Sequence, residues 1–178
     1  MANGRGSSAA KKNDRLARRA PPEGRPPALG LEALKSGDKV LIRQFELARD
    51  YAAAYALWEH SGPGVHVGMS DARSEIAKKL QRDPDLALVA EEDGRLIGTV
   101  IGGYDGRRGM VYHLAVAEDR RGRGVGQKLM AEVEARLKAK GCLKYYLLVT
   151  PQNRQVIEFY ERLGWGVMPN AIMGKEIK

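Results

Sequence analysis

The chain has 178 residues, a formal net charge of +8 and one cysteine, and this length suits one domain with an extension. No apolar run approaches the roughly 18 residues that a membrane span needs. The single cysteine excludes an intrachain disulfide and a cysteine-rich metal site. We therefore expect a cytoplasmic protein in a reducing compartment, with no membrane partner and no metal.

The first 36 residues are rich in Gly, Ser, Ala, Pro and basic residues, and they show no helical or strand periodicity. They hold eight Lys/Arg against three Asp/Glu, so five of the eight net positive charges lie there. We expect residues 1–36 to be a disordered tail and residues 37–178 to form one domain. A basic tail suits nucleic acid or an acidic surface, but a solvated extension explains the same composition, so nucleic acid is not a favoured partner.

The domain is predicted to begin with a strand over residues 40–45. Apolar residues then recur at helical spacing from Asp50 to Trp58, which predicts a helix, and the Gly- and Pro-containing residues 61–64 end it. Ser70 is a candidate N-cap of a second helix.

Three strands over residues 86–91, 95–103 and 110–116 are predicted to form an antiparallel meander. Asp93-Gly94 is a strong signal for a two-residue hairpin turn. A glycine-rich turn then leads into an amphipathic helix that ends at Gly141. Its apolar residues recur every four positions: Val125, Leu129, Val133 and Leu137.

The last part of the chain predicts a buried strand over residues 145–149 and a helix from Asn153 to Gly164. A final strand is expected near residues 171–177. The order β-α-α-β-β-β-α-β-α-β places a parallel crossover beside the meander. It predicts an α/β (α+β) fold with a mixed sheet of six to seven strands, flanked by four helices.

The glycine-rich turn is the stretch that suggests ligand binding. Closely spaced glycines let the backbone approach a ligand, and a helix that begins near Gly124 directs unpaired N–H groups and its positive dipole end into the turn. Such a turn suits a phosphate or pyrophosphate, although it lacks the Lys-Ser/Thr ending of a P-loop and the G-x-G-x-x-G spacing. The residues of the turn are Arg121, Gly122, Arg123, Gly124, Val125, Gly126 and Gln127.

Three pieces of the sequence resemble the GNAT superfamily of N-acetyltransferases over about residues 38–178. The first is the run of residues 113–116, and the second is the R-x-x-G-x-G pattern that begins at Arg121. The third is Asn153 followed seven residues later by Tyr160. Two positions of the third piece, where the family has Ala and Phe, differ here: Val156 and Trp165.

The resemblance implies that acetyl-CoA is the acetyl donor and that the turn from Arg121 to Gln127 binds its pyrophosphate. The pantetheine arm could replace a missing strand along the backbone of the fourth predicted strand, at Leu114, Ala115 and Val116. Sheet core is the ordinary structural role of these three side chains, and both roles are compatible.

Two residues of the last helix share one face because seven residues make two helical turns. On the resemblance, Asn153 would bind the pantetheine arm, and Tyr160 would donate a proton to the departing thiolate. Their ordinary structural roles would be an N-cap for Asn153 and core packing for Tyr160.

The bases that several family members carry are missing at the expected positions. By the two-residue period of a strand, the substrate face of the fourth predicted strand carries Met110, Tyr112 and Leu114, while His113 points the other way. Leu148 stands where N-terminal alanine acetyltransferases of the ribosomal-protein type have a Glu. Deprotonation through water is then expected, aided by one of three candidates: Tyr112, Glu59 or His66.

The function implied by the resemblance is acetyl-CoA-dependent transfer of an acetyl group to a primary amine. Because of Leu148, a small-molecule acceptor is favoured over a protein N-terminus or a lysine. The missing base motivates an alternative, an acyl-CoA-binding sensor without transfer activity. The sequence leaves the oligomeric state open between a monomer and a homodimer.

Overall fold

The computed structural model describes residues 40–62 and 64–177. The predicted tail, residues 1–36, and the predicted start of the domain at residue 37 lie outside the described residues. Among the described helices, none is long and apolar enough to cross a membrane.

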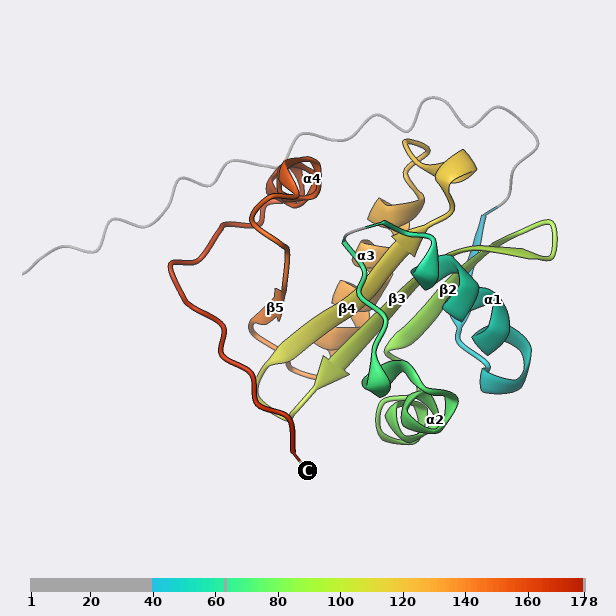
Figure 1. The fold of residues 1–178 in the computed structure, drawn as a ribbon, viewed down its shortest axis with the longest axis horizontal. Helices are drawn as coiled ribbons and strands as arrows, with labels where there is room; N and C mark the ends of the chain where they lie inside the picture. The colour runs from blue at the N-terminus through green and yellow to red at the C-terminus, as the bar shows by residue number, and fades with distance from the viewer. Residues whose placement is uncertain (1–39, 63, 178) are drawn as a thin grey trace, which may run out of the picture. The chain divides into compact units, whose positions relative to one another are not determined.

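A five-stranded mixed sheet is the centre of the fold (Figure 1). Strands β1 to β4 pair antiparallel in sequence order, and β5 pairs parallel to β4. The hairpin between β2 and β3 is confirmed, with positive φ at both Asp93 and Gly94. The strands are β1 (Leu41–Gln44), β2 (Ala87–Glu92), β3 (Arg95–Tyr104), β4 (Gly109–Val116) and β5 (Tyr145–Leu147).

Helices cover both faces of the sheet, with α1 and α2 in front of it and α3 behind it in Figure 1. Short 3-10 turns η1 (Met69–Asp71) and η2 (Glu118–Arg120) precede α2 and α3. The helices are α1 (Leu47–Glu59), α2 (Arg73–Arg82), α3 (Val125–Ala139) and α4 (Arg154–Arg162).

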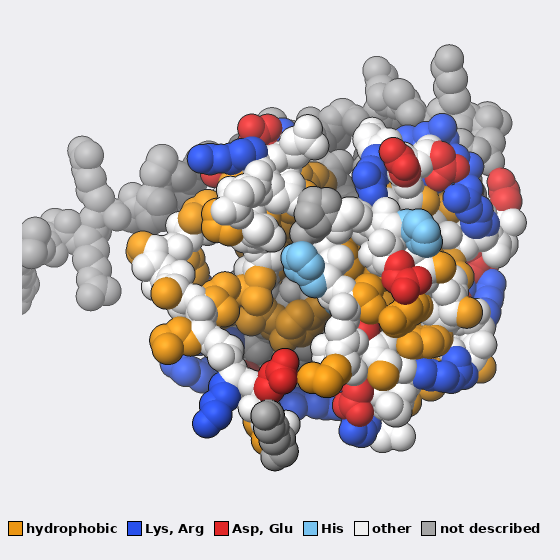
Figure 2. All heavy atoms as spheres, in the orientation of Figure 1, with side chains coloured by type: hydrophobic (Ala, Val, Ile, Leu, Met, Phe, Trp, Pro, Cys, Tyr) orange, Lys and Arg blue, Asp and Glu red, His pale blue; other side chains and the backbone are white. Residues whose placement is uncertain are grey.

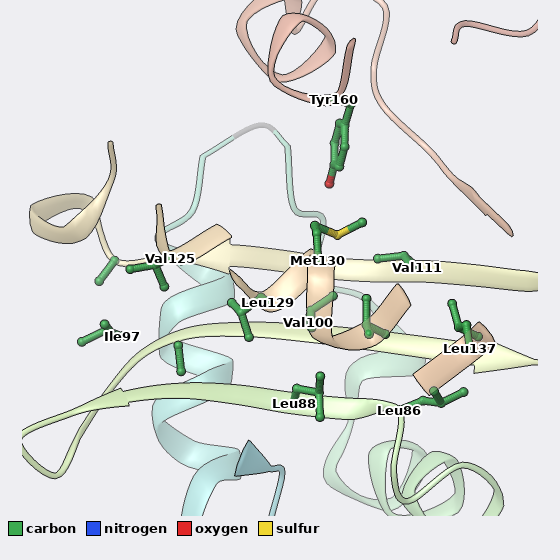
Figure 3. Close-up of a cluster of buried hydrophobic side chains, with 13 residues drawn as sticks. Leu86, Leu88, Ile97, Val100, Val111, Val125, Leu129, Met130, Leu137 and Tyr160 are labelled. Carbon is green, nitrogen blue, oxygen red and sulfur yellow. The ribbon is translucent and has the colours of Figure 1, made fainter. Parts of the chain in front are cut away.

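The core has two layers, one on each face of the sheet. The predicted apolar stripe of α3 is confirmed, because all four of its residues are buried against Leu88, Ile97 and Val100 of β2 and β3 (Figure 3). On the other face, Ala54 and Trp58 of α1 are fully buried in a second cluster. The sheet is therefore buried on both sides, as a strand followed by a crossover helix requires.

The strand count of the prediction is corrected by the structure. Five strands form in the described part of the chain, against the expected six to seven, and residues 171–177 form no strand. This segment has Gly174 at its centre and no clean alternation of apolar and polar residues, so neither propensity nor pattern favours a strand there. Three of its side chains are exposed instead: Ile172, Met173 and Ile177.

A β-bulge in β4 overturns the predicted facing of its side chains. Between the pairs Ile101–Tyr112 and Thr99–Ala115 the register shifts, so two residues of β4 oppose one residue of β3. His113 has φ of +48° and takes up the extra residue. Its side chain therefore lies on the α1 and α2 side of the sheet, as Tyr112 does, and Leu114 packs on the α3 side.

Gly102 of β3 lies where α3 packs closely on the sheet. A Cβ there would be 2.7 Å from Cγ2 of the buried Val133. We expect Gly102→Ala to lower the free energy of unfolding by about 1–3 kcal/mol through overpacking, and the melting temperature by several degrees. The matched control is Gly103→Ala in the same strand, where the nearest heavy atom would be 3.7 Å away. Equal melting temperatures for the two variants would contradict this packing.

Candidate functional site

The parting of β4 from β5 creates the site. The two strands pair only at Gly109–Val111 with Tyr145–Leu147. Among the described strands, the second half of β4 therefore has β3 on one side and none on the other. Backbone N–H and C=O groups on that open side need other partners. The open stretch includes the predicted donor-binding residues Leu114, Ala115 and Val116.

The side chains of this open stretch are core residues, as expected from their ordinary role. Leu114 and Val116 pack on the α3 layer, and Ala115 is 3% exposed in the layer beneath α1. Leu114 and Val116 are partly buried and Ala115 is buried, so the backbone is the polar surface that this stretch offers to a ligand. An extended ligand with amide groups matches such an edge, since it can bind as an added strand.

The glycine turn follows β4 and leads directly into α3. Gly122 and Gly124 have φ of +75° and +77°, a conformation that favours glycine. No side chain caps α3, and its first turn holds no acidic residue, whereas α1 and α2 carry Asp50 and Glu75 there. The first amides of α3 and its positive dipole end thus suit an anion, and a Cβ on Gly122 would meet open space.

Arg121 braces the end of β4 against this turn. Its Nε donates a hydrogen bond to the carbonyl oxygen of Val116 at 3.1 Å. The side chain thereby satisfies one carbonyl of the open strand, and its positive charge stays beside the turn. This bracing contact adds a structural role to the predicted phosphate-binding role of Arg121.

Asn153 is the N-cap of α4, which is the ordinary structural role expected of it. The side-chain oxygen of Asn153 accepts a hydrogen bond from the backbone N–H of Val156 at 3.4 Å, which caps α4. Its amide nitrogen would lie 3.0 Å from a Cβ on Gly64. The loop after α1 therefore reaches the start of α4.

Tyr160 extends from α4 towards Met130 of α3 with its hydroxyl foremost (Figure 3). It is 8% exposed, and its ring makes edge contacts with the rings of Phe159 and Trp165 at 5.1 and 5.6 Å. Burial raises the pKa of Tyr160 to about 12, so the phenol is protonated at neutral pH and can donate a hydrogen bond.

Gly126 sets how closely α4 approaches the glycine turn. A Cβ at this position would lie 3.4 Å from Cζ of Phe159 and 3.7 Å from Cγ2 of Val116. The absence of a side chain thus lets α4 pack near both α3 and the end of β4. The turn, the open strand and Tyr160 are brought together by this packing.

A hollow lies on the front of the molecule between the loop after α1 and the C-terminal segment (Figure 2). Hydrophobic side chains gather around it in that view. Tyr112 of β4 and Leu148, just after β5, are 46% and 53% exposed, and burial of its hydroxyl raises the pKa of Tyr112.

Sequence reasoning missed one polar pair on this side of the sheet. Nε2 of His113 lies 2.6 Å from Oδ1 of Asp71, while the predicted candidates Glu59 and His66 are exposed. The two-residue period of a strand predicted that His113 faces away from Tyr112. The bulge places both side chains on one face, and no local feature of the sequence marks that bulge. The two residues are 42 positions apart, so no local pattern could pair them.

Comparisons with known proteins agree with this geometry. The sequence profile described as "Acetyltransferase (GNAT) family" matches residues 45–165. An acetyltransferase of Pectobacterium atrosepticum is 41% identical over 128 residues, which are 72% of this chain and 89% of the relative.

Two solved structures share the fold. The Ard1 protein of Thermoplasma volcanium has a TM-score of 0.64 and 23% identity, covering 72% of this chain and 84% of that one. An aminoglycoside N-acetyltransferase in complex with CoA has a TM-score of 0.62 and 20% identity, covering 81% of this chain and 99% of that one.

Gly124→Asp is expected to weaken the binding of coenzyme A at least about tenfold, or about 1.4 kcal/mol. An Asp at this N-cap position places a carboxylate beside the first amides of α3, where it competes with a phosphate for them. The measurement is isothermal titration calorimetry. The control is Gly106→Asp, since Gly106 also has positive φ and lies in the turn between β3 and β4, away from α3. Unchanged affinity in Gly124→Asp would remove the turn from the donor site.

Proposed function

The chain belongs to the GNAT family of acetyltransferases, and on this premise we propose that it transfers the acetyl group of acetyl-CoA to the primary amine of a small molecule. The family makes it an acyltransferase with acetyl-CoA as its acyl donor. One observation carries the donor side of the proposal: the open edge of β4 leads directly to an uncapped helix start without acidic side chains. An extended pantetheine arm joined to a pyrophosphate, as in coenzyme A, matches both features.

The donor would lie along β4 with its pyrophosphate in the glycine turn. Amides from Gly122 to Gln127 would bind the phosphate oxygens, aided by the nearby positive charges of Arg121 and Arg123. The pantetheine amides would pair with the backbone of Leu114 to Val116. Because Asn153 caps α4 through its oxygen, its amide nitrogen is the group that would face the pantetheine arm.

Tyr160 would stabilise the departing thiolate. A phenol with a pKa of about 12 is a weaker acid than a thiol, whose ordinary pKa is about 8.5. A hydrogen bond from the phenol to the thiolate is therefore favoured over complete transfer of its proton. This role requires a protonated Tyr160, and its raised pKa keeps it protonated throughout the neutral range.

The acceptor side supports a small molecule. Leu148 provides no carboxylate next to β5, and the hollow in front of the sheet has hydrophobic side chains around it (Figure 2). A fold neighbour of this chain is an aminoglycoside N-acetyltransferase, so the fold accommodates small-molecule amines. The alternative function, a sensor that binds acyl-CoA without transfer, has no observation in its favour.

The test is acetyl transfer from acetyl-CoA to a panel of primary amines, followed by release of the free thiol. The panel contains alkylamines, arylamines, amino sugars and peptides with free N-termini. Faster thiol release with small amines than with peptides would support the proposal. Tight binding of acetyl-CoA with no thiol release for any amine would overturn it in favour of the sensor.

Tyr160→Phe is expected to lower kcat roughly 10–100-fold, because it removes a hydrogen bond to a charged group worth about 1.5–3 kcal/mol. The affinity for coenzyme A should change much less. Steady-state kinetics and calorimetry separate the two effects.

Tyr145→Phe is the matched control for this prediction. Tyr145 also packs against Trp165, but its hydroxyl donates a hydrogen bond to Glu134 of α3. We expect its kcat to stay near that of the unaltered protein. Equal losses of kcat and affinity in Tyr160→Phe would make Tyr160 a binding contact instead.

A further inference from the structure

The pair of His113 and Asp71 lies outside every role assigned so far. Asp71 is 6% exposed and belongs to η1, between α1 and α2. One carboxylate oxygen contacts Nε2 of His113 at 2.6 Å, and the other accepts the backbone N–H of Gly68 at 2.7 Å. An acid that is buried and fixed by two hydrogen bonds fixes the orientation of the imidazole in turn.

Two further contacts hold His113 in place. The indole of Trp58 lies against the imidazole, with ring centroids 4.6 Å apart. Thr99 accepts a hydrogen bond from the Trp58 Nε1–H at 2.8 Å and donates one to the carbonyl oxygen of His113 at 3.0 Å. Trp58 and Thr99 are both fully buried. The imidazole ring and the backbone carbonyl of His113 are therefore held by residues of the core.

The backbone at His113 is in an uncommon conformation. Its φ of +48° is unfavourable for a residue with a side chain, and such strain clusters at functional sites. The bulge re-aims the imidazole to the face that carries the hollow. Ala115, two residues further along β4, belongs to the stretch proposed to bind the donor.

The hydrogen bond to Asp71 decides which imidazole nitrogen can accept a proton. A carboxylate acceptor places the proton on Nε2, and this leaves the lone pair of the neutral ring on Nδ1. Within the described residues, Nδ1 has no hydrogen-bond partner and no buried side-chain nitrogen or oxygen is unsatisfied. Nδ1 therefore reaches solvent, on a side chain that is 15% exposed.

We propose that His113, oriented by Asp71, is the base that accepts a proton from the acceptor amine. This inference rests on the proposed acetyl transfer. Nδ1 takes one proton from the ammonium group and later releases it to solvent. The neutral nitrogen forms the C–N bond as the C–S bond breaks, and the thiolate leaves with the electron pair. When the amine nitrogen becomes an amide nitrogen it loses a second proton. That proton balances the one that the thiolate gains to become the free thiol.

Other ionisable groups on this side of the sheet are neutral or already paired. Desolvation raises the pKa of Tyr51 and of Tyr112, so both phenols stay protonated near neutral pH. Burial lowers the pKa of Lys79, which is paired with Asp83, and Arg73 stacks on the ring of Tyr51. Tyr51 of α1 donates a hydrogen bond to the backbone carbonyl of Asp71, and Arg73 of α2 lies over the ring of Tyr51. Tyr112 of β4 and Lys79 of α2 lie on the same side of the sheet, beside Gly103.

The test compares His113→Gln with the unaltered protein over pH 5.5–9, using the alkylamine of the panel that is acetylated fastest. In the unaltered protein we expect kcat/KM to fall with decreasing pH, because a protonated imidazole cannot accept a proton. His113→Gln should lower kcat/KM for the alkylamine about 10²–10⁴-fold at pH 7. Its remaining activity should rise with pH over the whole range, because that activity follows the fraction of alkylamine that is already neutral. An arylamine, which is already neutral at pH 7, should be affected much less than the alkylamine.

Three more variants separate catalysis from structure. Asp71→Asn should lower kcat/KM for the alkylamine more than for the arylamine, because the amide no longer fixes the proton of the imidazole on Nε2. His60→Gln is the matched control, since His60 is exposed and bonds only to the carbonyl oxygen of Ala56. His113→Asn tolerates positive φ better than Gln, and its melting temperature shows whether the fold is kept.

The outcomes are distinct. An unchanged pH profile in a folded His113 variant, or equal losses with alkylamine and arylamine, would overturn the assignment of His113 and leave acetyl transfer intact. A ¹⁵N NMR spectrum that places the proton of neutral His113 on Nδ1 would overturn it without any activity measurement. Absence of transfer to every amine by the unaltered protein would overturn the proposed function and this inference together.

Discussion

The structure depends on one constraint, the short pairing between β4 and β5. Three residue pairs join the two strands, and beyond them the backbone of β4 needs partners that the sheet does not supply. Arg121 satisfies one carbonyl, and α4 lies nearby without adding a strand. The site exists because the chain leaves this edge open while it buries both faces of the same strand.

The bulge in β4 is the second device that shapes the site. A regular strand would place Tyr112 and His113 on opposite faces. The bulge places both on the face with α1 and α2, at the cost of positive φ at His113. Asp71, Trp58 and Thr99 supply the contacts that stabilise this conformation. A buried polar network of this kind is stable only when its members are satisfied, and in the described part of the chain each buried polar side-chain atom has a partner.

Core packing and the site share the same residues. Tyr160 belongs to the main hydrophobic cluster, and its burial accounts for the raised pKa of its hydroxyl. Gly126 lets Phe159 approach the first turn of α3, so the distance between α4 and the turn is fixed by packing. Donor binding, thiolate stabilisation and the position of α4 therefore depend on one another.

Local patterns in the sequence determined the elements that depend on neighbours along the chain. The stripe from Val125 to Leu137, the turn at Asp93-Gly94 and the uncapped helix start at Gly124 all follow from spacing and residue type, because helices and tight turns are made of short-range contacts. Tertiary structure alone decided that His113 faces α1 and that Asp71 contacts it from 42 positions away. Strand pairing, bulges and long-range polar contacts depend on which surfaces meet in space, and residue spacing along a chain does not specify that.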